Sequence, residues 1–291
     1  MLSSIRGQRE VVCGDAVDWL ENTDDLFKGS VFTAIPDVKD IPLFNSMTDV
    51  IKRGELYKIW FVSVAERIFS RLPTGQVAIF SQTDAKVTDS NGHVVTWIDK
   101  GHLCAMAAEK CGCNMLWHKI TLDTAAPEGQ YRPSFTHLIC FGKRFTYHTT
   151  AFRTPDVLDR GMMSWNKATG LDACILGVAF LRNIVHTDIV ISPFCGKGTI
   201  LATANYFGLP SFGIEICAKR ARASLSKNLS DVLSALPLAH LQKLGMTQDS
   251  RSCSVVMSDT TDVLSSVCDT IEGKDSLDDD IEKEEDVNQS V

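Results

Sequence analysis

The chain has 291 residues, a hydrophobic content of 44% and a formal net charge of -7. This composition is ordinary for a globular protein, and no apolar run approaches the roughly 18 residues of a membrane-spanning helix. Residues 272–286 hold nine acids and two lysines, so this segment alone carries -7 and the remaining chain is formally neutral. We predict a folded domain over residues 1–248 and a disordered, solubilising tail over residues 249–291, with partner binding or autoinhibition as the tail's alternative role.

The cysteines point to a reducing compartment. There are ten, without paired spacing, and several lie within apolar runs, such as Cys140, Cys174 and Cys217. The close pair Cys111 and Cys113 has no second pair of Cys or His at zinc-site spacing. The pattern therefore predicts free thiols, a cytoplasmic or nuclear location and no metal site.

Two acids follow the first predicted strands. Residues 10–13 predict a short strand that leads to Asp15, which can cap the next helix or hydrogen-bond a ligand. Residues 30–35 predict a second, buried strand that ends at Pro36 and Asp37. A carboxylate in that place can act as a general base or orient a substrate N–H, and a plain turn residue after proline is the alternative.

In the middle of the chain, segments with helical periodicity alternate with apolar segments of strand length. It predicts helices over 56–72 and 101–110, strands over 76–81, 115–122 and 136–142, and a substrate-facing loop or short hairpin over 82–100. Residues 145–161 predict a crossover, residues 171–184 an apolar helix, and residues 218–228 and 230–244 two more helices. A lone histidine such as His118 is more often a hydrogen-bonded core residue than a catalyst.

Residues 187–217 predict a β-turn-α-β unit. An apolar strand, 188–192, ends in the turn Pro193-Phe194-Cys195-Gly196-Lys197-Gly198-Thr199, and a helix over 200–207 leads to a strand over 211–216. Glycine at 196 and 198 lets a ligand approach the backbone, and the helix amino end can bind an anionic group. Glu215, at the tip of the second strand, can accept hydrogen bonds from a ribose diol. The alternative is a packing unit whose glycines only tighten the turn.

The segments SPFCGKGT and, about twenty residues later, GIEI resemble the motif pair DPFxGxGT and GIE/D of S-adenosylmethionine (SAM) methyltransferases. By pattern they are similar to the nucleic-acid amino-methyltransferases (N6-adenine/N4-cytosine type), in which the SAM-binding half follows the catalytic half. Ser192 stands where the family has Asp, and Lys197 where it has Ser. Ser192 keeps a hydrogen-bonding group for the methionine moiety of SAM but loses the charge that would pair with its ammonium.

The resemblance implies SAM as cofactor and a set of residues around it. The cofactor-binding residues would be Asp15, Ser192, Pro193, Phe194, Gly196, Gly198, Thr199, Glu215 and Ile216, with the segment Trp165-Asn166-Lys167 at the border of the site. The catalytic residues would be Pro36 and Asp37, at the place of the family's D/N/S-P-P-Y/F/W tetrapeptide. When Pro36 is aligned with the second proline, Ala34 replaces the acid or amide and Asp37 replaces the aromatic residue.

The predicted fold is α/β, a doubly wound and mostly parallel sheet with one antiparallel edge hairpin, of the Rossmann-like class I methyltransferase type. Ligands of such sheets bind at the carboxyl ends of the strands, so Asp15, Asp37, Gly196, Gly198 and Glu215 should converge on one crevice.

The expected activity is methyl transfer from SAM to a nucleic acid, with RNA preferred over DNA as the partner and with small molecules or protein side chains left open. The folded body is not basic, although Arg132, Lys143, Arg144 and Arg153 cluster in sequence. The alternative is a catalytically inactive methyltransferase-fold subunit that binds a partner or nucleic acid. A dinucleotide oxidoreductase shares the β-turn-α-β unit, but the chain lacks the G-x-G-x-x-G near its N-terminus that such enzymes use. The sequence does not set the oligomeric state.

Overall fold

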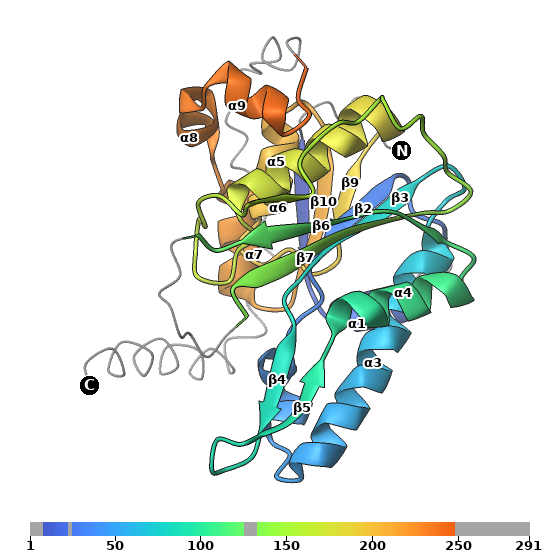
Figure 1. Ribbon diagram of the computed structural model, residues 1–291, viewed down its shortest axis with the longest axis vertical. Coiled ribbons are helices and arrows are strands. Elements are labelled where there is room, and N and C mark those ends of the chain that lie inside the picture. Colours follow the sequence, from blue (N-terminus) through green and yellow to red (C-terminus); the bar gives the residue numbers. More distant parts are fainter. Residues whose placement is uncertain (1–7, 23–24, 125–132, 248–291) are drawn as a thin grey trace, which may run out of the picture. The chain divides into compact units, whose positions relative to one another are not determined.

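The computed structural model describes residues 8–22, 25–124 and 133–247 (Figure 1). Its strands are β1 (Arg9–Cys13), β2 (Ser30–Thr33), β3 (Val77–Gln82), β4 (Ala85–Thr88), β5 (Val94–Ile98), β6 (Asn114–Leu122), β7 (Phe135–Gly142), β8 (Val157–Asp159), β9 (Val190–Ser192) and β10 (Ser211–Glu215). Its helices are α1 (Ala16–Asn22), the 3-10 turn η1 (Val38–Asp40), α2 (Pro42–Asn45), α3 (Val50–Arg71), α4 (Lys100–Lys110), α5 (Leu171–Phe180) with its π-helical extension η2 (Leu181–Val185), α6 (Thr199–Tyr206), α7 (Ala218–Ser226), α8 (Ser230–Ala235) and α9 (Leu238–Lys243).

Eight strands form one sheet in the order β1-β10-β9-β2-β3-β7-β6-β8. The first five run parallel, β7 is antiparallel to β3 and β6, and β8 is parallel to β6. This confirms the predicted doubly wound, mostly parallel sheet with its β6–β7 hairpin. The hairpin is not at the edge, because β8 adds a further strand where the sequence predicted only a crossover. Three residues are too few to give a periodic signal.

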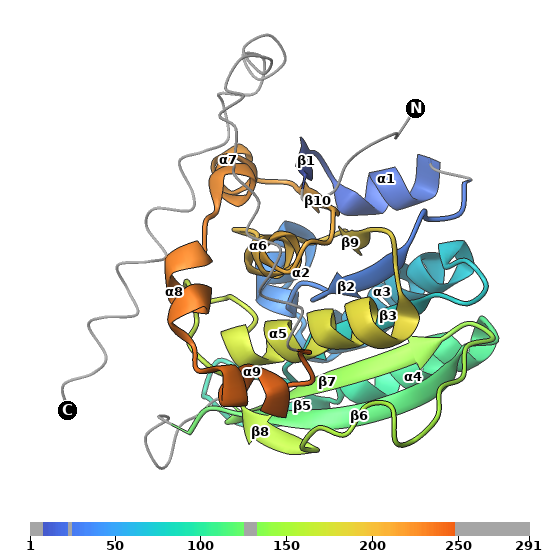
Figure 2. The same ribbon diagram turned by 90° about the horizontal axis from the view of Figure 1, so that it is seen from above.

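Two helical layers cover the sheet, and alternate strand residues face each layer. Helices α5 and α6 lie on one side of the sheet and α3 and α4 on the other (Figure 2). Phe32, Ile79 and Leu138 pack in the core with α5, α6, α8 and α9, whereas their neighbours Val31, Ala78 and Ile139 pack in the core with α1, α3 and α4. Side chains alternate between the two faces of a strand, so strands covered on both faces are apolar at every position.

Residues 82–100, predicted as a substrate-facing loop or short hairpin, form the β4–β5 hairpin outside the main sheet (Figure 1). It packs against α3 at Gly54, where an added Cβ would lie 3.3 Å from Thr96 Cγ2. The chain enters the hairpin from the carboxyl end of β3 and leaves it at the start of α4. The base of the hairpin is therefore at the edge of the sheet where ligands of this kind of fold bind.

Several predicted boundaries shift for physical reasons. Helix α3 begins at Val50 rather than at residue 56, because Asp49 caps it by accepting a hydrogen bond from Lys52 N at 3.0 Å. The helix predicted over 230–244 is two helices, because Pro237 lacks an N–H and separates α8 from α9. The acidic tail and Arg132 lie outside the described residues. Within the described ranges, no helix is long and apolar enough to cross a membrane.

Candidate active site

Residues 192–199, here called the glycine corner, connect β9 to α6. Gly196 and Gly198 have φ of 55° and 76°, in the left-handed region that favours glycine. A Cβ at Gly198 would lie 2.3 Å from Ser224 Oγ in α7, and a Cβ at Gly196 would lie 2.9 Å from the ring of Trp165. Both glycines are thus required by packing as well as by backbone conformation, so the packing alternative accounts for part of this motif.

The turn residues of the glycine corner are unequally accessible. Ser192 is fully buried and its hydroxyl lies 3.4 Å from that of Thr33 on β2. Thr199 is buried too, and its hydroxyl shares a 2.7 Å hydrogen bond with Ser164. Pro193 and Gly198 are buried, whereas Phe194, Gly196 and Lys197 are half-buried. Gly196, which consists of backbone alone, is therefore the half-buried point at which a ligand can approach the main chain, and the binding roles of Ser192 and Thr199 stay predictions.

Glu215 ends β10, next to the carboxyl end of β1. Its side chain is 8% exposed, and Oε1 accepts hydrogen bonds from Cys217 N at 3.0 Å and from Arg220 Nε at 2.9 Å. An ionised carboxylate has about four acceptor positions, so two internal donors leave capacity for a ribose hydroxyl. Ile216, the next residue, is exposed.

Asp15 lies beside this strand end, because Gly14 N donates to Glu215 O. Its carboxylate is exposed and accepts a hydrogen bond from Val17 N at 2.7 Å. That contact caps the first turn of α1, as the capping interpretation predicted. A second role in ligand binding stays a prediction.

Residues 34–40, here called the Pro-Asp corner, follow β2. The carbonyl of Pro36 accepts a hydrogen bond from the Tyr57 hydroxyl at 2.7 Å. The Gln82 amide, oriented by its hydrogen-bond pattern, donates to Ile35 O at 3.2 Å and accepts from Ile35 N at 2.6 Å. The backbone carbonyls of Ile35 and Pro36 thus each have an internal donor, and the side chain of Asp37 adds a carboxylate acceptor at this corner.

Two groups of the described residues donate to Asp37. Its Oδ1 accepts from Val38 N at 2.8 Å, which caps the turn η1, and from Lys100 Nζ at 3.2 Å. Burial, reinforced by the carboxylates of Asp37 and Asp40, raises the pKa of Tyr57, so its hydroxyl stays protonated as a donor. The Asp37 side chain is 33% exposed, which leaves it accessible from one side.

The two corners lie at the same edge of the sheet. Strands β2 and β9 are parallel neighbours with Val31 opposite Ile191, so their carboxyl ends meet. The Thr33 hydroxyl bridges them, because Phe194 N donates to it at 3.4 Å. The two distant stretches of chain are therefore brought to one edge of the sheet, and the common crevice for Asp15, Asp37, Gly196, Gly198 and Glu215 stays a prediction.

Residues 164–167 form a second connection between the two corners, in addition to Thr33. Lys167 Nζ forms a 2.9 Å ion pair with Asp40 of the Pro-Asp corner. The ring of Trp165 lies against Gly196, and Lys197 Nζ is 5.1 Å from its centroid. This segment therefore borders both corners, and the packing of Trp165 against the turn is present. Its place beside a bound cofactor stays a prediction.

A hydrogen-bonded network behind Asp37 was not predicted. Asp84 Oδ1 accepts from Lys100 N at 2.9 Å and lies 3.2 Å from His137 Nε2, and Oδ2 accepts from Trp97 Nε1 at 3.0 Å. His137 Nδ1 is in turn 2.9 Å from His118 Nε2. The sequence placed Asp84, Trp97 and Lys100 in one polar loop, but nothing in it linked them to the two histidines.

The network shifts the pKa values of Asp84 and His118. Burial alone would raise the pKa of Asp84, but hydrogen bonds from His137, Lys100 N and Trp97 outweigh it and the pKa is lowered. Burial, and then the neighbouring His137, lowers the pKa of His118. The network therefore contains an ionised carboxylate that is held by three described hydrogen-bond partners.

Asp84, Asp99 and His137 have ligand atoms within 4.8 Å of one another, close enough to hold a metal ion. The described contacts, however, already engage both ring nitrogens of His137 and both oxygens of Asp84. Asp99 caps α4 by accepting from His102 N at 2.8 Å. We therefore interpret these residues as a hydrogen-bonded network.

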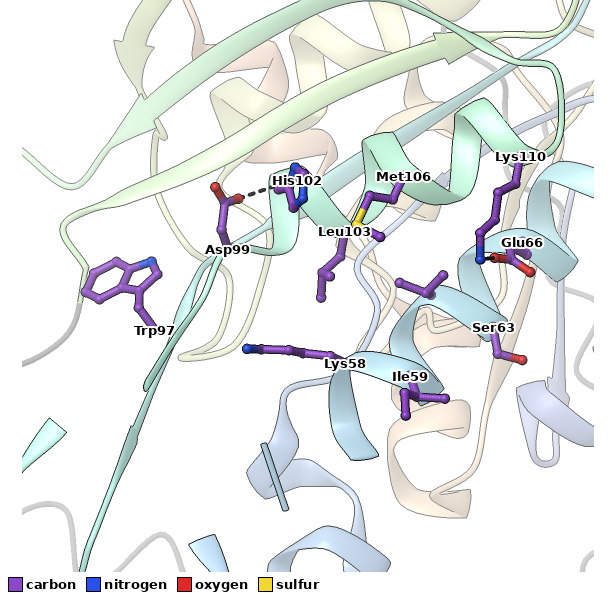
Figure 3. Close-up of a pocket in the computed structure, with 11 residues that line it drawn as sticks. Lys58, Ile59, Ser63, Glu66, Trp97, Asp99, His102, Leu103, Met106 and Lys110 are labelled. Atoms are coloured by element: carbon purple, nitrogen blue, oxygen red, sulfur yellow. Dashed lines mark hydrogen bonds and ion pairs between the residues drawn. The ribbon is translucent and has the colours of Figure 1, made fainter. Parts of the chain in front are cut away.

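A groove of about 610 Å³ lies between α3 and α4, next to the Trp97 end of the hairpin (Figure 3). Its lining residues are Lys58, Ile59, Val62, Ser63, Glu66, Trp97, Asp99, His102, Leu103, Met106 and Lys110. None of these residues belongs to the predicted cofactor or catalytic set. The groove is a feature separate from the two corners.

Comparison with known proteins supports the fold. No protein-family model matches the chain, and no curated protein does. Among solved structures, a proposed DNA modification methylase of Thermus thermophilus in complex with S-adenosyl-L-methionine is 16% identical, with a TM-score of 0.55 over 74% of this chain and 91% of that chain. PvuII DNA methyltransferase, which is cytosine-N4-specific, is 11% identical, with a TM-score of 0.56 over 86% of this chain and 96% of that chain.

The chain thus has the Rossmann-like fold of class I methyltransferases. Its Pro-Asp corner precedes its glycine corner in sequence, and both lie at the carboxyl edge of the sheet.

Proposed function

We propose that this protein is a SAM-dependent methyltransferase that acts on a nucleic acid. The observation that carries this proposal is the meeting of the glycine corner and the Pro-Asp corner at one sheet edge, through Thr33. One corner has the accessible glycine turn and the strand-end Glu215 that suit an adenosyl cofactor. The other presents a half-exposed carboxylate, Asp37, to an acceptor.

The residues fit SAM on structural grounds. Gly196, which consists of backbone alone, is half-buried and can be approached by a ligand, and a Cβ at this position would meet the ring of Trp165. Glu215 keeps acceptor capacity for a ribose diol beside the exposed Ile216. Ser192, which replaces the usual acid, is buried, so the ammonium of the cofactor would have to be bound by other groups.

When bound, SAM supplies an electrophilic methyl group, and its transfer to nitrogen breaks the C–S bond, forms a C–N bond and leaves the electron pair on sulfur. The protein's part is to align the acceptor and to receive the proton that nitrogen loses. Asp37 is the group placed for both tasks. Pro36 fixes the backbone before it, and its carbonyl is held by Tyr57.

The comparisons bear on the kind of nucleic acid. Both structural neighbours are described as DNA enzymes, so DNA replaces RNA as the first acceptor to test. Lys143, Arg144 and Arg153 of the basic cluster belong to the described residues, whereas Arg132 lies outside them.

The test has two stages. Calorimetry with SAM should show binding, and labelled SAM should then transfer its methyl group to DNA or RNA. Asp37→Asn should lower the transfer rate about 100-fold or more, because positioned proton transfer contributes about 10² to 10⁴, without loss of SAM binding. Asp18→Asn, a change at an exposed carboxylate in α1, is the matched control. Turnover of Asp37→Asn at the wild-type rate would remove Asp37 from the mechanism.

A non-catalytic subunit of this fold is the second candidate, favoured by one observation. Ala34 supplies no side-chain acceptor, and the backbone of Ile35 and Pro36 is already hydrogen-bonded to Gln82 and Tyr57. Such a protein would bind a nucleic acid or partner and transfer nothing. SAM binding without any methyl transfer to DNA, RNA or protein extracts would select this alternative.

A further inference from the structure

Lys100 is a buried cation beside the Pro-Asp corner. It opens α4 and its side chain is 3% exposed, yet its ammonium reaches Asp37 Oδ1 at 3.2 Å and lies 5.8 Å from the centroid of the Tyr57 ring. Lysine is almost never so deeply buried without a partner, because removing its charge from water is costly. Within the described part of the chain, Asp37 is its only ion-pair partner.

The main chain of Lys100 is fixed independently of this ion pair. Its N–H donates to Asp84 Oδ1 at 2.9 Å, and Asp84 is itself held by Trp97 and His137. Asp99, the preceding residue, caps α4. The backbone of Lys100 is therefore held in place, and its side chain brings the ammonium to the Pro-Asp corner. A supporting residue in a preorganised site is usually fixed in this way.

The two carboxylate oxygens of Asp37 have different surroundings. Both described donors to its carboxylate, Lys100 Nζ and Val38 N, bind Oδ1. Among the described residues no donor reaches Oδ2, and the Asp37 side chain is far more exposed than that of Lys100, 33% against 3%. The oxygen available to a ligand is thus Oδ2, and the ammonium stays behind it.

We propose that Lys100 is the positioning residue of the acceptor site. It holds Asp37 by Oδ1, so that Oδ2 accepts the N–H of the acceptor. Because the two charges cancel, the site takes an uncharged nitrogen, such as the amino group of a nucleobase, in preference to a cationic amine such as a lysine side chain. This inference rests on the proposed function and names the class of its acceptor nitrogen.

A first test needs no activity. Hydrogen exchange of residues 34–40 should become about tenfold faster in Lys100→Met, because the corner loses the contact that holds its carboxylate, and it should remain slow in Lys100→Arg. Lys52→Met, which removes an exposed lysine from α3, is the control and should change nothing at this corner. Unchanged exchange in a folded Lys100→Met would overturn the proposal.

The second test uses turnover. Lys100→Met should lower kcat about 100-fold, the size of effect expected from a misplaced reacting group, while the SAM dissociation constant stays within about twofold, because the glycine corner is intact. Lys100→Arg should recover part of kcat. In competition between a nucleic acid and a lysine-rich peptide, the preference for the nucleic acid should fall in Lys100→Met, because Asp37 then carries an uncompensated negative charge.

The two tests separate the failure of this inference from that of the proposed function. A wild-type protein that transfers no methyl group refutes the proposed function, whereas the exchange experiment still decides whether Lys100 holds Asp37. Wild-type turnover that Lys100→Met matches, in kcat and in acceptor preference, refutes the role of Lys100 and leaves the methyltransferase assignment standing.

Discussion

The glycine corner and the Pro-Asp corner lie on neighbouring strands, but the chain builds them differently. The first is a contiguous stretch whose shape comes from the backbone, with positive φ at Gly196 and Gly198. The second depends on side chains that arrive from α3, β3 and α4, namely Tyr57, Gln82 and Lys100. A backbone site can be encoded locally, whereas an acceptor site made of side chains exists only after the tertiary structure has formed.

The largest expected effect comes from adding a side chain to the glycine corner, which tests whether its shape depends on glycine. Gly198→Ala should lower the free energy of unfolding by about 3 kcal/mol, because it adds a strained φ, at about 1–2 kcal/mol, to overpacking against Ser224. Gly75→Ala is the control, since Gly75 has a φ of 82° but open space around its Cβ position. It should lose only the conformational part, about 1 kcal/mol.

Urea denaturation of the two variants measures this difference, and calorimetry should show that Gly198→Ala alone weakens SAM binding. Equal losses of stability in both variants would mean that packing against α7 does not constrain the turn. The shape of the glycine corner would then not depend on a close approach between Gly198 and α7.

The next effect tests the side-chain network on the acceptor side. Asp84→Asn should lower the free energy of unfolding by about 2 kcal/mol at neutral pH, because hydrogen bonds to a charged acceptor contribute about 1.5–3 kcal/mol and an amide in place of the carboxylate cannot accept from donors on both sides. SAM affinity should not change. Asp18→Asn, at an exposed site, should leave both quantities near wild type.

The pH dependence of the same variant has a definite sign. The folded-state pKa of Asp84 is lowered, so its contribution to stability is complete above the unfolded-state pKa of about 3.9 and is lost as the pH falls through the folded-state value. The stability difference between wild type and Asp84→Asn should therefore shrink in acid. A difference that stays constant down to the acid transition would show that ionised Asp84 does not organise the network.

This contrast explains what the sequence could predict. The mostly parallel sheet and the glycine corner have local signals, such as apolar runs of strand length and glycines at a strand-to-helix turn. The position of Asp37 near the carboxyl end of β2 was predictable for the same reason, because an apolar run of strand length precedes Pro36 and Asp37. Strand β8 was not predictable, since three residues are too few to show the alternation of a strand.

The network behind Asp37 had no local signal either. Asp84 and His137 are 53 positions apart, and Lys100 and Asp37 are 63 apart. Nothing in the pattern around Lys100 marks it as buried, since it directly follows the helix-capping Asp99 and could equally be a solvated residue at the start of α4. Only the antiparallel pairing of β7 with β3, which sets His137 opposite Gln82, brings the histidine to the end of the strand that leads to Asp84.

The smallest expected effect concerns the energetic coupling between the two corners. The ion pair between Asp40 and Lys167 connects the Pro-Asp corner to the segment that lies over the glycine turn, and the side chains of Lys167 and Asp40 are 42% and 31% exposed. Exposed pairs contribute about 0.2–1 kcal/mol. A double-mutant cycle of Asp40→Asn and Lys167→Gln should thus give a coupling of about 0.5 kcal/mol that disappears at about 1 M salt.

The pair of Lys110 with Glu66 is the matched control, because it is similarly exposed and lies between α3 and α4 in the groove. Its coupling in unfolding experiments should be similar, but only the Asp40–Lys167 cycle should show any coupling in SAM binding. A coupling above about 2 kcal/mol, beyond the range of exposed ion pairs, would mean that the corners open and close as one unit. The glycine corner would then depend on side chains as much as the Pro-Asp corner does.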